Sequence, residues 1–282
     1  MTGMRARLLI FLGAGTWLAA QGLQFNTIGD ELVLSRLNRI AGDNHARAAM
    51  LETLFEEAGC RAPARESQKV KASKNPNIVC TLEGESGEDI ILVSAHFDKV
   101  QAGAGALDNW SGAALLPSLY ESLAIGRSVK HKFMFIGFTD EEKGLAGSKA
   151  WVEANRKTFL KNIRAVVNID SVGAGPLYIW HTKADQTLEQ AALRIGQAVK
   201  FPLSGMSADR VGMTDAFPFH DRKVPTIDFH SLDDKIIRLL HTNNDQLAVI
   251  KTDEYKSTYR FLAIYLRYLD TQLTVSTPPA PR

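Results

Sequence analysis

Short runs of apolar residues that do not alternate with polar ones constrain the fold of this chain more than any other feature. Three of them read "DIILVSA" from Asp89, "HKFMFIGF" from His131 and "IRAVVNID" from Ile163. A strand with one solvated face alternates apolar and polar residues, so these runs predict strands that are covered on both faces. Shorter strands are expected over 77–84, 176–180 and 224–229.

Helical patterns separate these runs. In 111–125, four leucines recur on one helical face, and Pro117 predicts a kink or a late start. Asp43 is placed to cap a helix that follows it. The alternation of strands and helices predicts an α/β fold, a three-layer α-β-α sandwich with a mostly parallel mixed central sheet. The other helices are expected over 27–42, 44–59, 144–155, 185–199 and 253–273.

The first 22 residues have the pattern of a signal peptide. Arg5 and Arg7 precede a mostly apolar run over 8–20, and small residues follow it. The run is shorter than the ~20 residues of a membrane-spanning helix, but an uncleaved membrane anchor is the alternative. We therefore expect a secreted or periplasmic protein with a signal peptide over 1–22, a single domain over 23–273 and a flexible tail over 274–282.

The charge balance argues against a nucleic-acid partner. The chain has 33 basic and 31 acidic residues, and Arg5 and Arg7 are the only charged residues in the predicted signal peptide. Its removal leaves a neutral chain without the basic surface that nucleic-acid binding requires. No membrane partner is expected once the signal is removed.

Two cysteines fit an exported protein. Cys60 ends a predicted helix and Cys80 lies in the predicted strand "NIVCTLEG". If the chain is exported, the two can form one disulfide, and the alternative is a pair of buried free thiols.

Acidic and histidine residues follow several of the predicted strands or precede helices. In open α/β sheets, ligands bind beyond the carboxyl ends of the strands, so these side chains are candidates for one site. Each of them alone has an ordinary explanation, such as a helix cap or a surface pair. Their recurrence favours a shared function. The candidates are His96, Asp98, Asp108, Glu141, Glu142, Asp170 and His241.

The residue types are those of a metal site. Two imidazoles and three carboxylates are good zinc ligands, and five ligands fit two metals if one carboxylate bridges them. Two metals can activate one water and polarise a carbonyl together. Asp98 can hold the other ring N–H of His96. Of the adjacent glutamates, one can bind metal while the other accepts a proton from the water.

These residues lie in stretches that resemble the co-catalytic zinc aminopeptidases of the aminopeptidase Y type, in a clan with glutamate carboxypeptidase II and the glutaminyl cyclases. Five stretches agree in order and approximate spacing, which makes the resemblance specific. They are "SAHFD" (94–98), "GALDNWSG" (105–112), "FTDEEKGLAGS" (138–148), "NIDSVG" (168–173) and "HTNND" (241–245).

The resemblance implies a role for each candidate. His96 and Asp170 would bind one zinc, Glu142 and His241 the second, and Asp108 would bridge the two. Glu141 would be the general base and Asp98 the acid that orients His96. The family also implies a cis peptide between Asp108 and Asn109. The implied substrate is a peptide with a free N-terminus, from which the N-terminal residue is hydrolysed.

Two alternatives stay open. One is a glutaminyl cyclase-like acyltransferase, whose members use one zinc and lack the Gly-Leu-x-Gly-Ser continuation found at 144–148. The other is a non-catalytic ectodomain, although every ligand position is filled. The chain lacks the tyrosine that some relatives place near the reacting carbonyl, which leaves Arg210, a backbone N–H or the zinc ions alone for that role. Side-chain specificity is expected from the loop at 204–222, with candidates Trp110, Met206, Met213, Phe217 and Phe219.

Overall fold

A mixed eight-stranded sheet forms the centre of the molecule. The computed structural model describes residues 4–8, 22–126, 128–210 and 212–274. In sheet order the strands are β3 (Arg65–Gln68), β4 (Asn77–Leu82), β6 (Lys132–Phe138), β5 (Ile90–His96), β7 (Ile163–Ile169), β10 (Thr226–His230), β8 (Tyr178–Ile179) and β9 (Ser204–Gly205). The central strands β6, β5, β7 and β10 are mutually parallel, whereas β3, β4 and β8 add antiparallel pairings.

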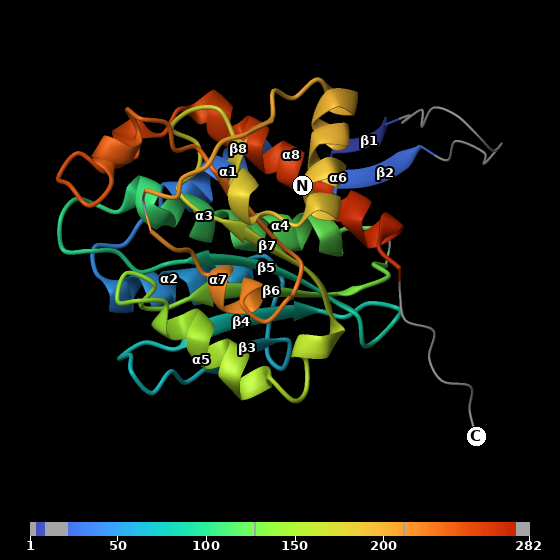
Figure 1. The fold of residues 1–282 in the computed structure, drawn as a ribbon, viewed down its shortest axis with the longest axis horizontal. Coiled ribbons are helices and arrows are strands. Elements are labelled where there is room, and N and C mark those ends of the chain that lie inside the picture. Colours follow the sequence, from blue (N-terminus) through green and yellow to red (C-terminus); the bar gives the residue numbers. More distant parts are fainter. Residues whose placement is uncertain (1–3, 9–21, 127, 211, 275–282) are drawn as a thin grey trace.

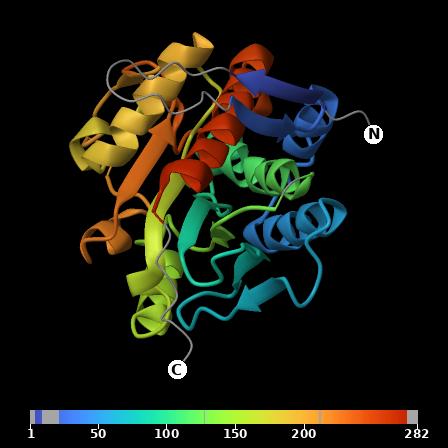
Figure 2. The same cartoon turned by 90° about the vertical axis from the view of Figure 1, so that its right-hand side faces the viewer.

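Helices cover both faces of this sheet, as expected (Figures 1 and 2). Side chains from five longer helices and from the short helix α3 (Ser111–Ala113) pack in one core, and side chains from α5 and α7 pack in a second core on the other face. The five are α1 (Asp30–Leu37), α2 (Asn44–Glu57), α4 (Leu115–Ala124), α6 (Gln186–Val199) and α8 (Thr252–Gln272). The opposite layer contains α5 (Ala146–Asn155) and α7 (Phe217–His220).

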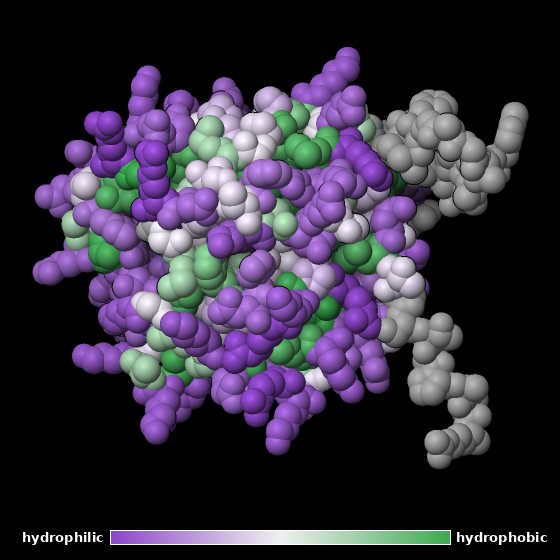
Figure 3. All heavy atoms as spheres, viewed as in Figure 1, coloured by the Kyte–Doolittle hydropathy of each residue, from purple (hydrophilic) through white to green (hydrophobic). Residues whose placement is uncertain are grey.

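The two cores explain why the strands show no polar alternation. Successive side chains of a strand point to opposite faces. On β5, Leu92 packs with the α5 side and Val93 with the five-helix side, and both are fully buried. The surface seen in Figure 3 is mostly hydrophilic, with smaller hydrophobic areas between the polar side chains. This fold is the predicted three-layer sandwich.

Local signals placed two helix boundaries correctly. The Asp43 carboxylate accepts a hydrogen bond from the Ala46 N–H at 2.8 Å and caps α2. The helix predicted over 111–125 is divided into α3 (Ser111–Ala113) and α4, which starts two residues before Pro117. Proline has no N–H to donate to the preceding turn, which accounts for the division.

The predictions missed elements at the edge of the fold. β3 is polar because it is an edge strand, paired on one side with β4 only, so it gave no hydrophobic signal. The helix predicted over 27–42 spans only α1, because β2 (Leu23–Thr27) precedes it. β2 pairs antiparallel with β1 (Met4–Leu8). The loop expected over 204–222 contains β9 and α7.

The predicted signal peptide and tail lie largely outside the described residues, so both stay predictions. Of the segment 1–22, the structure describes residues 4–8 and 22; of the tail 274–282, it describes residue 274. None of the helices in the described ranges combines the length and apolarity that a membrane crossing needs. The predicted disulfide is confirmed, because Cys60 and Cys80 are bonded and fully buried.

Candidate active site

The strand-end side chains named from the sequence meet at one edge of the sheet. His96 is the last residue of β5, Asp170 directly follows β7, and Glu141 and Glu142 follow β6 after a turn. Asp108 lies in the short helical turn η1 (Ala106–Trp110). The carboxyl ends of parallel neighbouring strands meet at the same edge, which is why residues so far apart in sequence come together.

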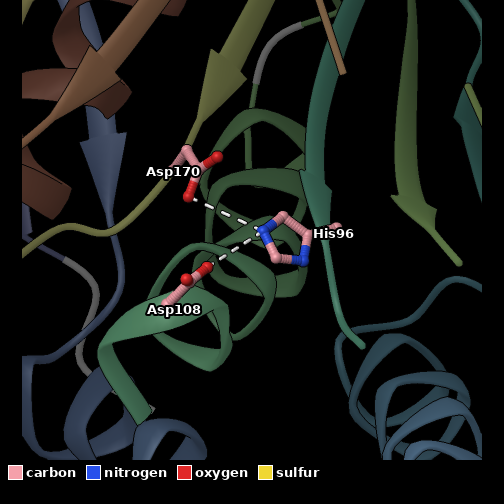
Figure 4. Close-up of side chains that lie close together, drawn as sticks. All are labelled: His96, Asp108 and Asp170. Carbon is pink, nitrogen blue, oxygen red and sulfur yellow. Dashed lines mark ion pairs between the residues drawn. The ribbon is translucent and has the colours of Figure 1, made fainter. Parts of the chain in front are cut away.

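A first cluster contains His96, Asp108 and Asp170 (Figure 4). The His96 Nε2 atom lies 3.3 Å from Asp108 Oδ1 and 3.6 Å from Asp170 Oδ1. All three side chains direct their ligand atoms toward a common point in the close-up. One imidazole and two carboxylates converging in this way are a suitable set of metal ligands.

A second cluster contains Asp108, Glu142 and His241. The His241 Nε2 atom lies 3.1 Å from Asp108 Oδ2 and 3.0 Å from Glu142 Oε2. Asp108 therefore directs one carboxylate oxygen to each cluster. A shared carboxylate between two donor groups is the arrangement expected of a residue that bridges two metals.

The donors fit a divalent cation at each cluster. Glu142 Oε1 is buried and has no hydrogen-bond partner among the described residues. Hydrogen bonding to Asp108 raises the pKa of His241 to about 9, and burial raises the pKa of Glu142 to about 7. A protonated His241 adds positive charge, and a protonated Glu142 carries no negative charge, so both shifts reduce the negative charge of a site crowded with carboxylates. A bound cation would offset the same negative charge, and it would also supply a partner for the Glu142 Oε1 atom.

Asp98 contacts both sides of the site. Its Oδ1 atom lies 3.5 Å from His96 Nδ1, while its backbone carbonyl is a hydrogen-bond acceptor 3.2 Å from the same nitrogen. Its two carboxylate oxygens accept hydrogen bonds from the backbone N–H groups of Glu141 (3.0 Å) and Glu142 (3.3 Å). Asp98 thus contacts both His96 and the turn that contains Glu141 and Glu142.

Glu141 differs from its neighbour in environment. It lines the same cleft, but its carboxylate belongs to neither cluster. Burial raises its pKa to about 10, with Asp215, Asp170 and Asp108 adding to the rise and His96 opposing it. The carboxylate of Glu142 thus lies in a donor cluster, whereas that of Glu141 lies in the cleft outside both clusters.

Residues that sequence reasoning did not assign hold the Asp108 turn. The Asn109 side chain donates to the Ile169 carbonyl (2.9 Å), and its Oδ1 accepts from Ser171 N–H (3.1 Å). Buried Arg47 donates to the carbonyls of Ala104 and Gly105. The peptide between Asp108 and Asn109 is cis, as the resemblance implied.

The walls of the cleft differ from the predicted specificity residues. Only Met213 of the five candidates lines it. The Trp110 indole is buried and donates to the Leu37 carbonyl, and Phe219 packs in the core with α5. Arg210 is exposed and does not line the cleft. Besides the acidic and histidine residues named above, the lining includes Ser171, Trp180, Gly212, Met213, Thr214, Asp228, Phe229, His230, Leu232 and Leu240.

Comparison with known proteins agrees with this geometry. The model of Peptidase family M28 matches residues 77–266, which is more than half of the chain and includes every residue of the two clusters. The chain belongs to Peptidase family M28. This assignment confirms the resemblance drawn from the five motifs.

One curated relative matches part of the chain. Aminopeptidase YwaD of Bacillus subtilis is 31% identical over 146 residues, which cover 50% of this chain and 32% of YwaD. The chain spans about a third of the length of this curated relative.

Two solved structures share the fold. The LapA aminopeptidase of Legionella pneumophila aligns with a TM-score of 0.76 and 18% identity over 88% of this chain and 73% of LapA. The glutaminyl cyclase of Porphyromonas gingivalis aligns with a TM-score of 0.66 and 20% identity over 86% of this chain and 97% of the cyclase. An aminopeptidase and a glutaminyl cyclase thus share this fold. The fold alone does not identify the activity, which has to be argued from the site residues.

Proposed function

We propose that this M28 member is a zinc aminopeptidase that hydrolyses the N-terminal residue from peptides. The observation that carries the proposal is the pair of donor clusters that share Asp108, with the separate carboxylate of Glu141 in the same cleft. The similarity to YwaD supports peptide hydrolysis as the reaction. A non-catalytic ectodomain, the alternative, would not require both donor clusters together with a separate Glu141 carboxylate.

The proposal includes two zinc ions, one at each cluster. Imidazole and carboxylate donors suit zinc, and Asp108 would contribute one oxygen to each ion. When bound, such a pair polarises a carbonyl and lowers the pKa of a water molecule. His96 and Asp170 would complete the first set of ligands, and Glu142 and His241 the second.

Glu141 would move the proton in this reaction. Its carboxylate accepts a proton from the attacking water while the water oxygen bonds to the scissile carbonyl carbon. When the C–N bond breaks, the same side chain passes that proton to the leaving amine. The high pKa that burial gives Glu141 falls when positive charge is nearby, as the influence of His96 already shows. Asp98 would hold Glu141 in place through the backbone hydrogen bond.

A substrate panel with metal control tests the proposal. The protein is freed of metal with a chelator and assayed on aminoacyl-aminomethylcoumarin substrates and on an N-terminally blocked analogue, before and after two equivalents of zinc are added. We expect zinc-dependent release from the free-amine substrates only. Cyclisation of a glutaminyl peptide is measured in parallel. Cyclisation without hydrolysis would favour the acyltransferase, and zinc binding with neither reaction would favour the ectodomain.

A further inference from the structure

A buried carboxylate that the proposed chemistry does not use lies in the cleft. Asp228 is on β10, is 2% exposed and belongs to neither donor cluster. Its Oδ1 atom accepts hydrogen bonds from the Asn168 amide (2.9 Å) and the Thr214 hydroxyl (2.6 Å). Its Oδ2 atom makes no hydrogen bond to any residue that the structure describes, although Asp228 lines the cleft.

The surroundings of Asp228 leave its charge uncompensated. No lysine, arginine or histidine in the described ranges lies within ion-pair distance of it. His230 is two residues further along β10, and its two nitrogens contact the Met206 carbonyl (3.0 Å) and the Leu232 N–H (3.0 Å). Because both ring nitrogens are occupied in this way, His230 is a neutral donor–acceptor pair and makes no ion pair with Asp228. A buried carboxylate without a cationic partner is costly, so its placement in a ligand cleft points to a ligand that carries the partner.

The position of Asp228 separates it from the reacting groups. In the parallel pairing of β7 and β10, Asp228 is opposite Asn168, which is two residues before Asp170. Asp228 is thus deeper in the cleft than the cluster residues at the strand ends. A substrate that met Asp228 through its side chain would have its carbonyl nearer the strand ends, where the clusters lie.

The rest of the lining suits an alkyl chain that ends in a cation. Trp180, Met213, Leu232 and Leu240 supply apolar surface along the cleft. The loop that contributes Met213 is fixed by hydrogen bonds, because the Trp180 indole donates to Asp209 (2.9 Å) and Thr214 donates to Asp228. An alkyl stem packs on this wall while its charged end meets the carboxylate, as lysine and arginine side chains do elsewhere.

We propose that Asp228 makes this cleft selective for peptides whose N-terminal residue is lysine or arginine. This inference rests on the proposed aminopeptidase function, and it identifies the substrate class of the same site. The ammonium or guanidinium of the substrate side chain would donate a charge-assisted hydrogen bond to the free Oδ2 atom. Burial raises the pKa of Asp228 to about 6, so the carboxylate is ionised in an assay at pH 8.

The matched variant is Asp228→Asn. Its side-chain oxygen can still accept from Asn168 and Thr214, so the local bonds are kept while the charge is removed. Asp234→Asn, on an exposed loop, is the control for the same change in net charge. The substrates are the aminomethylcoumarin derivatives of lysine and norleucine, which share the alkyl chain and differ in the terminal ammonium.

We expect the zinc-loaded wild type to favour lysine over norleucine in kcat/KM, and Asp228→Asn to lower the lysine value by about 10- to 100-fold. The norleucine value should stay within about two-fold, and Asp234→Asn should change neither. A wild type that favours norleucine overturns the inference. So does an equal loss on both substrates, since that result would place Asp228 at the α-amine or in the support of the loop.

Calorimetric binding of L-lysinamide and L-norleucinamide to the zinc-loaded protein separates this inference from the proposed function. Tighter binding of lysinamide that Asp228→Asn abolishes supports the inference even if no substrate is hydrolysed, in which case only the aminopeptidase proposal fails. Equal binding of the two amides by the wild type overturns the inference even in an active enzyme.

Discussion

The carboxylate of Asp245 holds the backbone of Asp108 in place. Asp245 Oδ2 accepts a hydrogen bond from the Asp108 N–H at 3.1 Å, and its Oδ1 accepts one from the Leu107 N–H at 2.7 Å. Asp245 is 2% exposed and lies four residues after His241 in the chain. One loop therefore supplies a member of the second cluster and also positions the residue that both clusters share.

We expect Asp245→Asn to weaken zinc binding by about 10- to 100-fold, the usual effect of losing a group that supports a metal ligand. An amide replaces one acceptor oxygen with an NH2 group, so one of the two backbone N–H groups loses its partner. Affinity is measured by competition with a chromogenic chelator. The control is Asp253→Asn on α8, where the side chain is 94% exposed. Unchanged zinc affinity in Asp245→Asn would show that the loop is held without this carboxylate.

The neighbouring glutamates should respond differently to the same substitution. Glu142→Gln replaces a carboxylate whose Oε2 lies 3.0 Å from His241 Nε2, so the zinc content should fall from two ions per chain toward one. Glu141→Gln leaves both clusters intact, so the zinc content should be kept while kcat falls by about 10²- to 10⁴-fold. Elemental analysis and turnover are measured on the same samples. Full turnover in zinc-loaded Glu141→Gln would remove Glu141 from the mechanism.

The sequence was sufficient to predict which residues meet in the two clusters, because their placement follows from local patterns and a general rule. Unbroken apolar runs identify buried strands, and ligands bind beyond their carboxyl ends. His96 and Asp170 needed only this rule. Asp108 and His241 are in loops, and they were recognised through the motifs around them. The separate roles proposed for Glu141 and Glu142 come from the resemblance.

The cleft walls could not be predicted, because contacts between distant residues place them. The loop at 204–216 is held by the His230 ring on the Met206 carbonyl and by Asp228 on Thr214. No periodicity in the sequence reports contacts of this kind. The prediction therefore places Trp110 and Phe219 in the cleft, although both are core residues. The signal for Asp228 was present as an acidic residue inside an apolar strand, "VPTIDF". A buried acid inside such a strand is costly, but Asp228 lies before the end of its strand and so falls outside the rule that ligands bind beyond the carboxyl ends.

The disulfide between Cys60 and Cys80 should stabilise the packing of α2 against the sheet. Cys60 and Cys80 are 20 residues apart, and the bond ties the segment after α2 to β4. A disulfide that closes a loop of this length restricts the unfolded chain, and it raises the free energy of unfolding by about 2–4 kcal/mol. We expect the double variant Cys60→Ala and Cys80→Ala to lose about this much free energy of unfolding in urea. Its zinc content should not change, because neither cysteine contacts the clusters; a loss of zinc would show that the bridge shapes the site.

Removing zinc should destabilise the whole domain. Without a cation, the carboxylates of Asp108, Glu142 and Asp170 are close together, and one buried oxygen of Glu142 lacks a partner. A ligand at a concentration of a hundred times its Kd raises the free energy of unfolding by about 2.7 kcal/mol. This corresponds to a rise in Tm of about 5–10 °C for a domain of this size.

We therefore expect zinc to raise the Tm of the chelator-treated protein by about 5–10 °C for each site that it fills, as followed by circular dichroism. His241→Ala removes one ligand of the second cluster only, so its shift should be about half that of the wild type. Because His96 and Asp170 remain, the first site should still bind. A variant shift equal to that of the wild type would mean that His241 does not hold zinc, and a complete loss would mean that the two sites fill only together.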